Sequence, residues 1–289
     1  MSEGTSLINL GELSKPATVL IEKISEAVGG YFKPYQIKRV AKAEAEVEII
    51  KAETQIEITE LQRRALTRFI LEESIKQENI ESITEKAILE LTEGANPQNI
   101  EDDWITNFFD KCRIISDEEM QSLWAMILAG EANSPGTFSK RTVNFLASLD
   151  KEDAKFFTTL CGFCWMVKPL VPIVYDYKAD IYKKSGINFS SLNHLEAIGL
   201  ISTQPLTGIS VIESDGFVSY FGTQLNLDVE SFVNGEFKVG KVVFTRIGAQ
   251  LAHICKAEPI DGFFDYTVEK WVEMNLKPNS PYPKLEQDQ

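Results

Sequence analysis

The feature that most constrains this chain is the long stretch from Pro34 to Glu78, which contains no glycine and no second proline. Proline is favourable in the first turn of a helix, and the residues that follow are mostly strong helix formers. At 1.5 Å per residue, a continuous helix of this length would reach about 68 Å, which exceeds the width of a compact domain. The sequence therefore predicts a long charged helix over 34–78.

Apolar residues recur along this predicted helix at spacings of three and four, with gaps, and its other faces are charged. A narrow stripe with charged flanks favours coiled-coil-like pairing with a partner helix or a second protomer, so we expect a homo-oligomer. The heptad is imperfect, because Thr54 and Arg68 fall where apolar residues would continue the seam. A solvated connector helix is the alternative, and pairing within one chain or between chains stays open. The candidate interaction residues are Val40, Val47, Ile50, Ile58 and Leu61.

An amphipathic segment, residues 1–33, precedes the long helix. Its part 16–28 has apolar residues at helical spacing, and glycines then stop the helix. We favour a helix that docks on the body of the protein, because its polar face is not basic; peripheral contact with a membrane surface is the alternative. The chain shows no secretory signal, no long apolar run and few cysteines. These features predict a cytoplasmic protein, with peripheral contact at the inner membrane left open.

Glycines, prolines and helix-capping residues divide the remaining chain into segments. Capped, aromatic-rich helices predict a helical bundle over 79–168, with Asn79 as the cap of its first helix. Over 169–277 the order helix, helix, strand, hairpin and helix is typical of a small winged-helix-like α+β module. Residues 278–289 are expected to be a flexible tail. The predicted fold class is mainly α, with a coiled-coil-like helix, a bundle and this module.

The sequence contains no motif that identifies a reaction. Cys161 and Cys164 form a C-x-x-C pair, which can be half of a zinc site or a redox dithiol. Because the pair lies near the end of an apolar predicted helix, we favour two buried cysteines that pack as small hydrophobic residues. We expect a non-enzymatic protein with no catalytic residue, no cofactor and no metal. The alternative is a metal-dependent hydrolase whose activity would require Asp102, Asp103 or Glu131.

The charge of the chain limits its partners. The formal net charge is −14, and the part from Gly186 onward carries seven Lys and Arg against thirteen Asp and Glu. A helix that reads the major groove needs Arg, Lys, Asn or Gln, and the candidate helix FSSLNHLEAIG offers only Asn193 and His194. We therefore do not expect nucleic-acid binding. An acidic C-terminal module used for contact with a protein partner, as in a scaffold or adaptor, is the alternative to a self-assembling effector.

A specific pattern, LWA-x-ILAGE-x-N-x-PG-x-FS-x-RT, begins at Leu123. With this pattern and the Ala/Glu-rich helix after Pro34, the chain resembles an uncharacterised bacterial family catalogued as a domain of unknown function. We interpret the pattern as a structural hinge, in which Trp124 buries apolar surface and Glu131 pairs with Arg141 across the turn. An interaction surface at Trp124, Glu131 and Arg141 is the alternative.

The layout is also distantly similar to abortive-infection alpha-type proteins of bacteria. The segments Gly199-Leu200-Ile201 and Phe244-Thr245-Arg246-Ile247-Gly248 fit the ending of their C-terminal module. This resemblance implies a role in antiphage defence through growth arrest or death, and it supplies no catalytic residues. Our hypothesis is a non-enzymatic defence or stress effector that acts through self-assembly and through protein or membrane-surface contacts.

Overall fold

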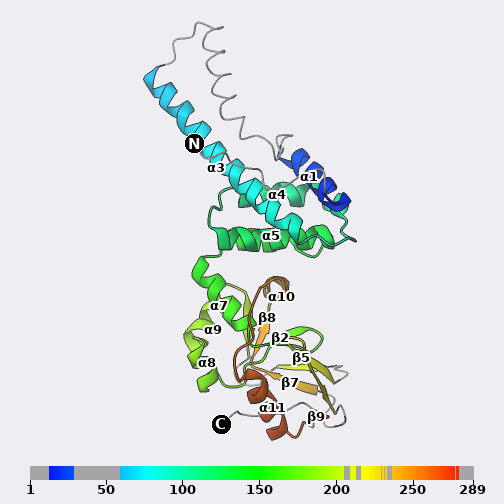
Figure 1. Ribbon diagram of the computed structural model, residues 1–289. Coiled ribbons are helices and arrows are strands. Elements are labelled where there is room, and N and C mark those ends of the chain that lie inside the picture. Colours follow the sequence, from blue (N-terminus) through cyan, green and yellow to red (C-terminus); the bar gives the residue numbers. More distant parts are fainter. Residues whose placement is uncertain are drawn as a thin grey trace, which may run out of the picture. The chain divides into compact units, whose positions relative to one another are not determined.

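The computed structural model describes residues 13–28, 59–204, 209–212, 216–228, 230, 232, 236–276 and 278–279. The chain forms two compact units, Met1–Ser148 and Leu149–Gln289 (Figure 1). Among the described residues, no helix combines the length and the apolar character needed to cross a membrane.

The described part of the first unit is helical. Its elements are α1 (Lys15–Ala27), α3 (Glu60–Leu89), the 3-10 turn η2 (Pro97–Asn99), α4 (Asp102–Cys112), α5 (Glu118–Asn133) and α6 (Lys140–Leu146). The predicted helix over 16–28 is confirmed as α1, whose buried side chains are Ala17, Leu20 and Ile24. The helix contacts η2 and α4, and Lys23 Nζ lies 2.5 Å from Asp102 Oδ1. The apolar face of α1 is therefore covered by the unit itself.

The predicted helix start at Asn79 is wrong, because α3 continues without a break from Glu60 to Leu89. Asn79 lies inside this helix with 4% of its surface exposed, and its Nδ2 donates to Arg113 O at 2.9 Å and to Ser116 Oγ at 3.1 Å. Its Oδ1 accepts from Gln121 Nε2 at 3.2 Å. The polar side chain that resembles a helix cap in the sequence instead joins α3 to the connection between α4 and α5.

The core of the first unit is built from large side chains of α3, α4 and α5. The Trp104 and Phe108 rings stack at 5.2 Å, and Phe108 meets Trp124 edge to face at 5.1 Å. Phe108 and Trp124 have no exposed surface, and α3 contributes Ile83 and Ala87. Aromatic residues bury large areas per side chain, so this cluster fixes α4 against α5.

The second unit combines helices with short antiparallel strands. Its helices are α7 (Lys151–Cys161), α8 (Asp180–Lys184), α9 (Phe189–Ala197), α10 (Arg246–Ala252) and α11 (Phe263–Glu273). Its strands are β1 (Cys164–Met166), β2 (Leu170–Pro172), β3 (Ile201–Thr203), β4 (Ile209–Ile212), β5 (Phe217–Tyr220), β6 (Thr223–Leu227), β7 (Glu236–Gly240), β8 (Val242–Phe244) and β9 (Pro278–Asn279). The larger sheet has the order β2-β1-β5-β6-β9, and β3-β8 and β4-β7 form two further pairs.

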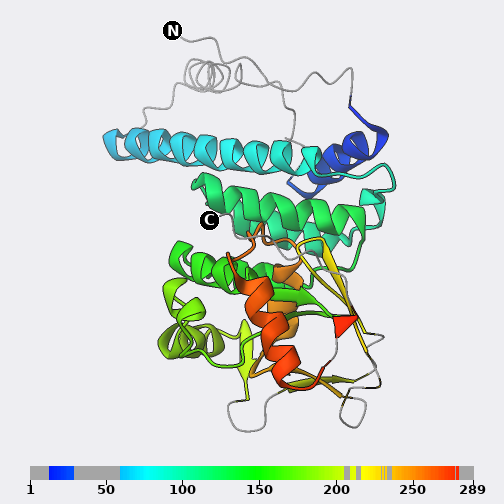
Figure 2. The same ribbon diagram turned by 60° about the horizontal axis from the view of Figure 1, so that its bottom comes forward.

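One face of the larger sheet carries the aromatic core of the second unit. Trp165 on β1 and Tyr220 on β5 are buried with rings 5.3 Å apart. Trp165 also stacks on Phe264 at 5.3 Å and meets Trp271 at 4.6 Å, which places α11 against this face (Figure 2). The indole N–H of Trp165 is buried without a hydrogen-bond partner.

The last helix of the predicted bundle, expected over 151–167, is shorter in the structure, because α7 ends at Cys161 and residues 164–166 form β1. A Cβ at Gly162 would lie 2.8 Å from Glu258 O, so the chain leaves the helix where another segment approaches closely. Trp165 then pairs with Val171 in the β1–β2 hairpin. The helix-rich prediction is confirmed. Of the predicted tail, residues 278–279 pair with β6, and residues 280–289 lie outside the described part.

Candidate interaction surface

The sequence placed its first candidate residues on the long helix. Val40, Val47, Ile50 and Ile58 lie outside the described residues. Leu61 lies in the first turn of α3, which begins with a capping box between Thr59 and Gln62, and 68% of Leu61 is exposed. The candidate surface is therefore built from the part of α3 that the structure describes.

Apolar residues recur on the core side of α3 beyond the bundle. The buried residues of α3 all lie between Asn79 and Ala87. At 3.6 residues per turn, the earlier residues Leu61, Ala65 and Phe69 fall on the same side of the helix as this buried face, within about 100° of arc. These three residues, called the α3 stripe, are exposed, with 58% of Phe69 open to solvent. Glu72 and Lys76 lie on this same side of α3 and separate the exposed α3 stripe from the buried face.

The reason is the difference in length between α3 and α5. The two helices pack against each other and contain 30 and 16 residues. Their lengths are therefore about 45 Å and about 24 Å. The first half of α3 extends past the end of α5 (Figure 1). An exposed apolar stripe on a helix that extends past its packing partner is typical of a surface that receives another element.

Charges along this part of α3 are separated by sign. Between Glu60 and Arg68 there are three arginines and one glutamate, a net charge of +2. Between Glu72 and Glu78 there are three glutamates and one lysine, a net charge of −2. Neighbouring pairs also form along the helix, such as Arg68 Nε to Glu72 Oε1 at 3.5 Å, but exposed pairs of this kind contribute little to stability.

Glu131, at the end of α5, holds the following turn. Only 2% of this residue is exposed, and its carboxylate accepts hydrogen bonds from the backbone N–H of Gly136 at 2.6 Å and of Phe138 at 2.8 Å. Burial raises the pKa of the carboxyl group, although both N–H donors act in the opposite direction. The predicted ion pair with Arg141 is wrong, since Arg141 is an exposed residue of α6. The turn folds back, so the carboxylate of Glu131 accepts from backbone N–H groups instead of pairing with Arg141.

Other residues of the sequence pattern fasten the same turn. A Cβ at Gly130 would lie 2.6 Å from the Phe138 ring, so this position accepts no side chain. Asn133 Nδ2 donates to Glu90 O at 3.0 Å, which ties the end of α5 to the end of α3. Trp124 is fully buried, and its indole N–H has no hydrogen-bond partner. The contacts of the pattern thus hold the turn after α5 in place.

The acidic residues of the hydrolase alternative each have a structural partner. Asp102 pairs with Lys23, as described above, and Asp103 Oδ2 lies 3.2 Å from Lys140 Nζ. Glu131 is bound to backbone N–H groups. In the described ranges, no three His, Cys, Asp or Glu side chains are placed to hold a metal ion. The geometry therefore offers the hydrolase alternative no support.

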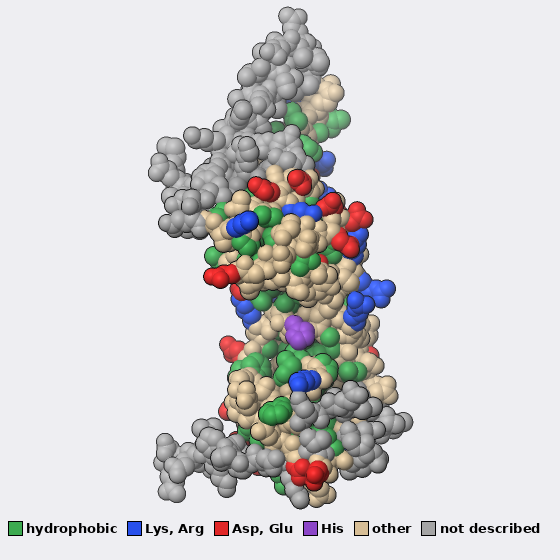
Figure 3. Space-filling view, turned by 90° about the vertical axis from the view of Figure 1, so that its right-hand side faces the viewer, with side chains coloured by type: hydrophobic (Ala, Val, Ile, Leu, Met, Phe, Trp, Pro, Cys, Tyr) green, Lys and Arg blue, Asp and Glu red, His purple; other side chains and the backbone are tan. Residues whose placement is uncertain are grey.

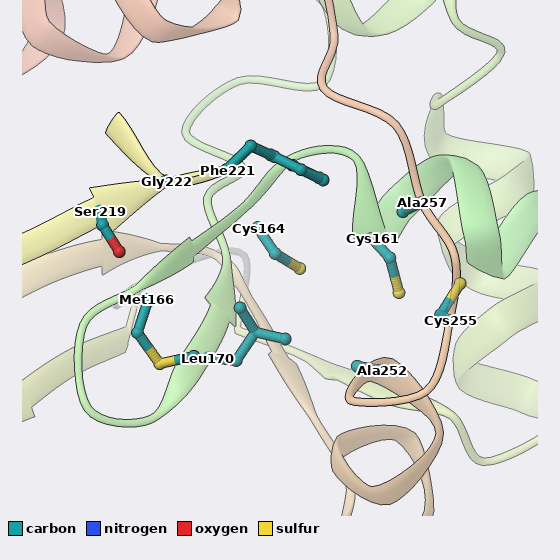
Figure 4. Close-up of a pocket in the computed structure, with 10 residues that line it drawn as sticks. All are labelled: Cys161, Cys164, Met166, Leu170, Ser219, Phe221, Gly222, Ala252, Cys255 and Ala257. Carbon is teal, nitrogen blue, oxygen red and sulfur yellow. The ribbon is translucent and has the colours of Figure 1, made fainter. Parts of the chain in front are cut away.

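The C-x-x-C pair occupies two elements, with Cys161 ending α7 and Cys164 beginning β1. Both thiols line a pocket of the second unit together with Cys255 (Figure 4). Burial raises the pKa of the Cys161 thiol well above its usual value. Cys255 is far from Cys161 in the chain, and the fold brings its thiol to the pair. The sequence also gave no signal for two further lining residues, Met166 and Phe221.

These features define a helix-rich protein of two units with an exposed apolar stripe on one helix. A family model described as "Protein of unknown function (DUF2806)" matches residues 63–267. The chain belongs to this family, as its resemblance to a family of unknown function predicted. No curated protein and no solved structure matches the chain.

Proposed function

We propose that this protein acts through self-assembly and protein contacts, without catalysis of its own, and that α3 joins two copies. The observation that carries the proposal is the α3 stripe, which lies on the core side of its helix and is exposed at Leu61 and Phe69. Water contact at these side chains is unfavourable, and a second copy of the same helix covers them with the same apolar surface.

The charges of α3 favour an antiparallel pair. Two copies that each carry a formal charge of −14 repel each other over most of their surfaces. The part from Glu60 to Glu78 has no net charge, and its two halves carry +2 and −2. Antiparallel helices bring each positive half beside a negative half, whereas parallel helices bring like charges together. Phe69 lies at the centre of this part, so the two phenyl rings meet near the twofold axis.

The expected dimer is weak to moderate. Covering Leu61 and Phe69 contributes about 1.5–3 kcal/mol for each side chain, and two copies double this gain. Association costs about 4–15 kcal/mol in lost translational and rotational freedom. The gain is thus about 6–12 kcal/mol, the same size as the cost, and the balance predicts a weak dimer that dissociates on dilution.

Light scattering of the full chain at several concentrations tests the proposal. We expect a molar mass that rises with concentration towards twice 32.5 kDa. Phe69→Ser should lower the mass to that of the monomer while the helical circular dichroism stays unchanged. Leu71→Ser is the matched control, because Leu71 is 60% exposed on the other side of α3. A wild-type monomer at all concentrations, or equal dissociation of both variants, would contradict the proposal.

The biological role that we propose is that of a bacterial defence or stress effector. The resemblance to abortive-infection alpha-type proteins in Gly199-Leu200-Ile201 and in the segment from Phe244 supports this role. Peripheral membrane contact through residues 1–33 is the alternative to protein contacts alone, and the buried apolar residues of α1 favour docking within the unit. A cytoplasmic location agrees with a role inside the cell.

A scaffold or adaptor function of the second unit is the other candidate. We propose that this unit is a winged-helix-like module used for protein contact. The supporting observation is that α9 leads into β3, which pairs with β8, and that Thr245 then caps α10. Because α9 contains no Lys or Arg, this helix lacks the cations that a nucleic-acid contact would require.

A further inference from the structure

The outer face of the larger sheet in the second unit is uncharged. Side chains alternate between the two faces of a strand, so Trp165 and Tyr220 point to the core while Cys164, Met166 and Ser219 share the opposite face. Met166 and Ser219 lie directly opposite each other on β1 and β5. Hydrophobic side chains are exposed on the side of the second unit where β5 lies (Figure 3). This face is the floor of a pocket.

The pocket has a volume of about 250 Å³ and is closed on its other side by the end of α7, by α10 and by the segment that follows α10 (Figure 4). None of its lining residues is charged, in a chain in which 25% of residues are charged. Burial keeps the Cys161 thiol protonated by raising its pKa, and the pKa of the Cys255 thiol is also raised, first by its neighbour Cys161 and then by burial. Such a lining selects an uncharged group.

Phe221, at the mouth of this pocket, has an unfavourable backbone conformation for its residue type. It forms with Gly222 the two-residue turn between β5 and β6, and their φ angles are 43° and 89°. Such turns favour Asn and Gly, and a bulky side chain at positive φ is an outlier. Phe221 is nevertheless 45% exposed. Its ring meets Tyr220 edge to face at 4.9 Å, and nearly half of its surface stays open. A bulky residue that opposes its own turn and stays half-exposed indicates a further contact made in a bound state.

The lining also indicates which uncharged group fits. Three thiols and the thioether of Met166 supply sulfur atoms, which make favourable contacts with aromatic rings. Phe221 offers a ring for edge-to-face packing. The exposed side chains of Met166 (41%) and Phe217 (61%) extend the apolar surface along β1 and β5. That surface is longer than a single aromatic ring, so it can also contact the peptide backbone on either side of a bound ring.

We propose that this pocket binds an uncharged aromatic side chain presented by a segment of a partner protein. The ring enters between Phe221 and the sulfur atoms, and the flanking backbone covers Met166 and Phe217. This site lies in the second unit and is independent of the pairing through α3, so either proposal can fail without the other.

Methyl NMR of the full chain, labelled with 13C at the methionine methyls, tests the site. The chain has five methionines, and Met166→Leu identifies the Met166 signal. The probe is the capped peptide acetyl-Gly-Gly-Phe-Gly-Gly-amide, with Leu or Glu in place of Phe as comparison peptides. We expect a saturable upfield shift of the Met166 methyl with the Phe peptide, and binding at least about tenfold weaker with Leu or Glu. No saturable shift, or equal binding of the Leu peptide, overturns the proposal.

Phe221→Asn separates a binding role from a folding role. Asn suits the turn, so we expect the melting temperature to rise by about 2–5 °C while the affinity for the Phe peptide falls at least about tenfold. Phe189→Asn is the control, because Phe189 is 66% exposed on α9, away from this pocket, and should leave binding unchanged. Unchanged affinity in Phe221→Asn overturns the site. Equal binding of the single residue N-acetyl-phenylalaninamide and the peptide overturns the assignment to a protein segment.

Discussion

At the scale of single residues, the turn after α5 is held by three different kinds of contact. Glu131 binds two backbone N–H groups, Gly130 leaves room for the Phe138 ring, and the indole N–H of Trp104 donates to Phe138 O at 2.7 Å. All three act on the same short segment, and none depends on a charge in solvent. The turn should therefore tolerate changes at exposed positions far better than changes at these contacts.

Glu131→Gln tests this account against an ion pair with Arg141. The amide retains one acceptor oxygen, so one buried backbone N–H loses its partner, and we expect a loss of about 1–3 kcal/mol in the free energy of unfolding. Arg141→Ala should change that free energy by less than about 0.5 kcal/mol, because Arg141 is exposed. Urea unfolding measures both. Equal losses of unfolding free energy in the two variants would contradict this account and support the ion pair between Glu131 and Arg141.

The residue roles that could be predicted from the sequence are those that depend on neighbouring residues in the chain. Ser139 and Thr245 each precede a helical run in the sequence, and they cap α6 and α10 by accepting hydrogen bonds from the N–H groups of residues three positions later. A cap acts within one helical turn, so the sequence around it contains its partner. The role of Asn79 depends on Arg113 and Ser116, more than thirty residues away. No local pattern distinguishes such a bridge from a cap.

At the scale of elements, the ends of helices were harder to predict than their existence. The run from Leu160 to Val167, at the end of α7 and in β1, has no charged or polar side chain apart from its cysteines, and a short apolar run suits a buried strand as well as a helix. In the structure, residues 164–166 form a strand because they pair with β2 and β5. The pocket beside β1 escaped prediction for the same reason, because its cysteines meet only when the sheet and α10 assemble.

The charge pattern of α3 gives a prediction about its orientation in the dimer. Reversing the positive half with Arg63→Glu and Arg64→Glu puts negative charge beside the negative half of the partner, so light scattering should show a monomer at low salt. Adding Glu72→Arg and Glu73→Arg exchanges the two signs and should restore the dimer. If the first pair of changes leaves the dimer intact, the helices are not antiparallel.

At the scale of the whole molecule, the family match extends from α3 into α11 and therefore includes parts of both units. The two proposed surfaces lie one on each unit. A dimer through α3 carries two copies of the aromatic pocket, and two linked sites bind a partner with repeated aromatic segments more tightly than one site does. Self-assembly and partner binding then act together, as an effector that is triggered by its own concentration requires.

Growth of bacteria that overproduce the protein tests this combined function. We expect the wild-type chain to slow growth and to reduce phage yield, because a high concentration favours the dimer. Phe69→Ser should remove both effects at an equal protein level, since it removes the pairing surface and leaves the fold intact. Leu71→Ser should behave as the wild type, because its side chain lies off the α3 stripe. If the wild-type chain changes neither growth nor phage yield, the effector role is wrong, and the scaffold or adaptor function of the second unit becomes the better account. If Phe69→Ser still arrests growth as a monomer, the activity resides in one copy and assembly through α3 is not its trigger.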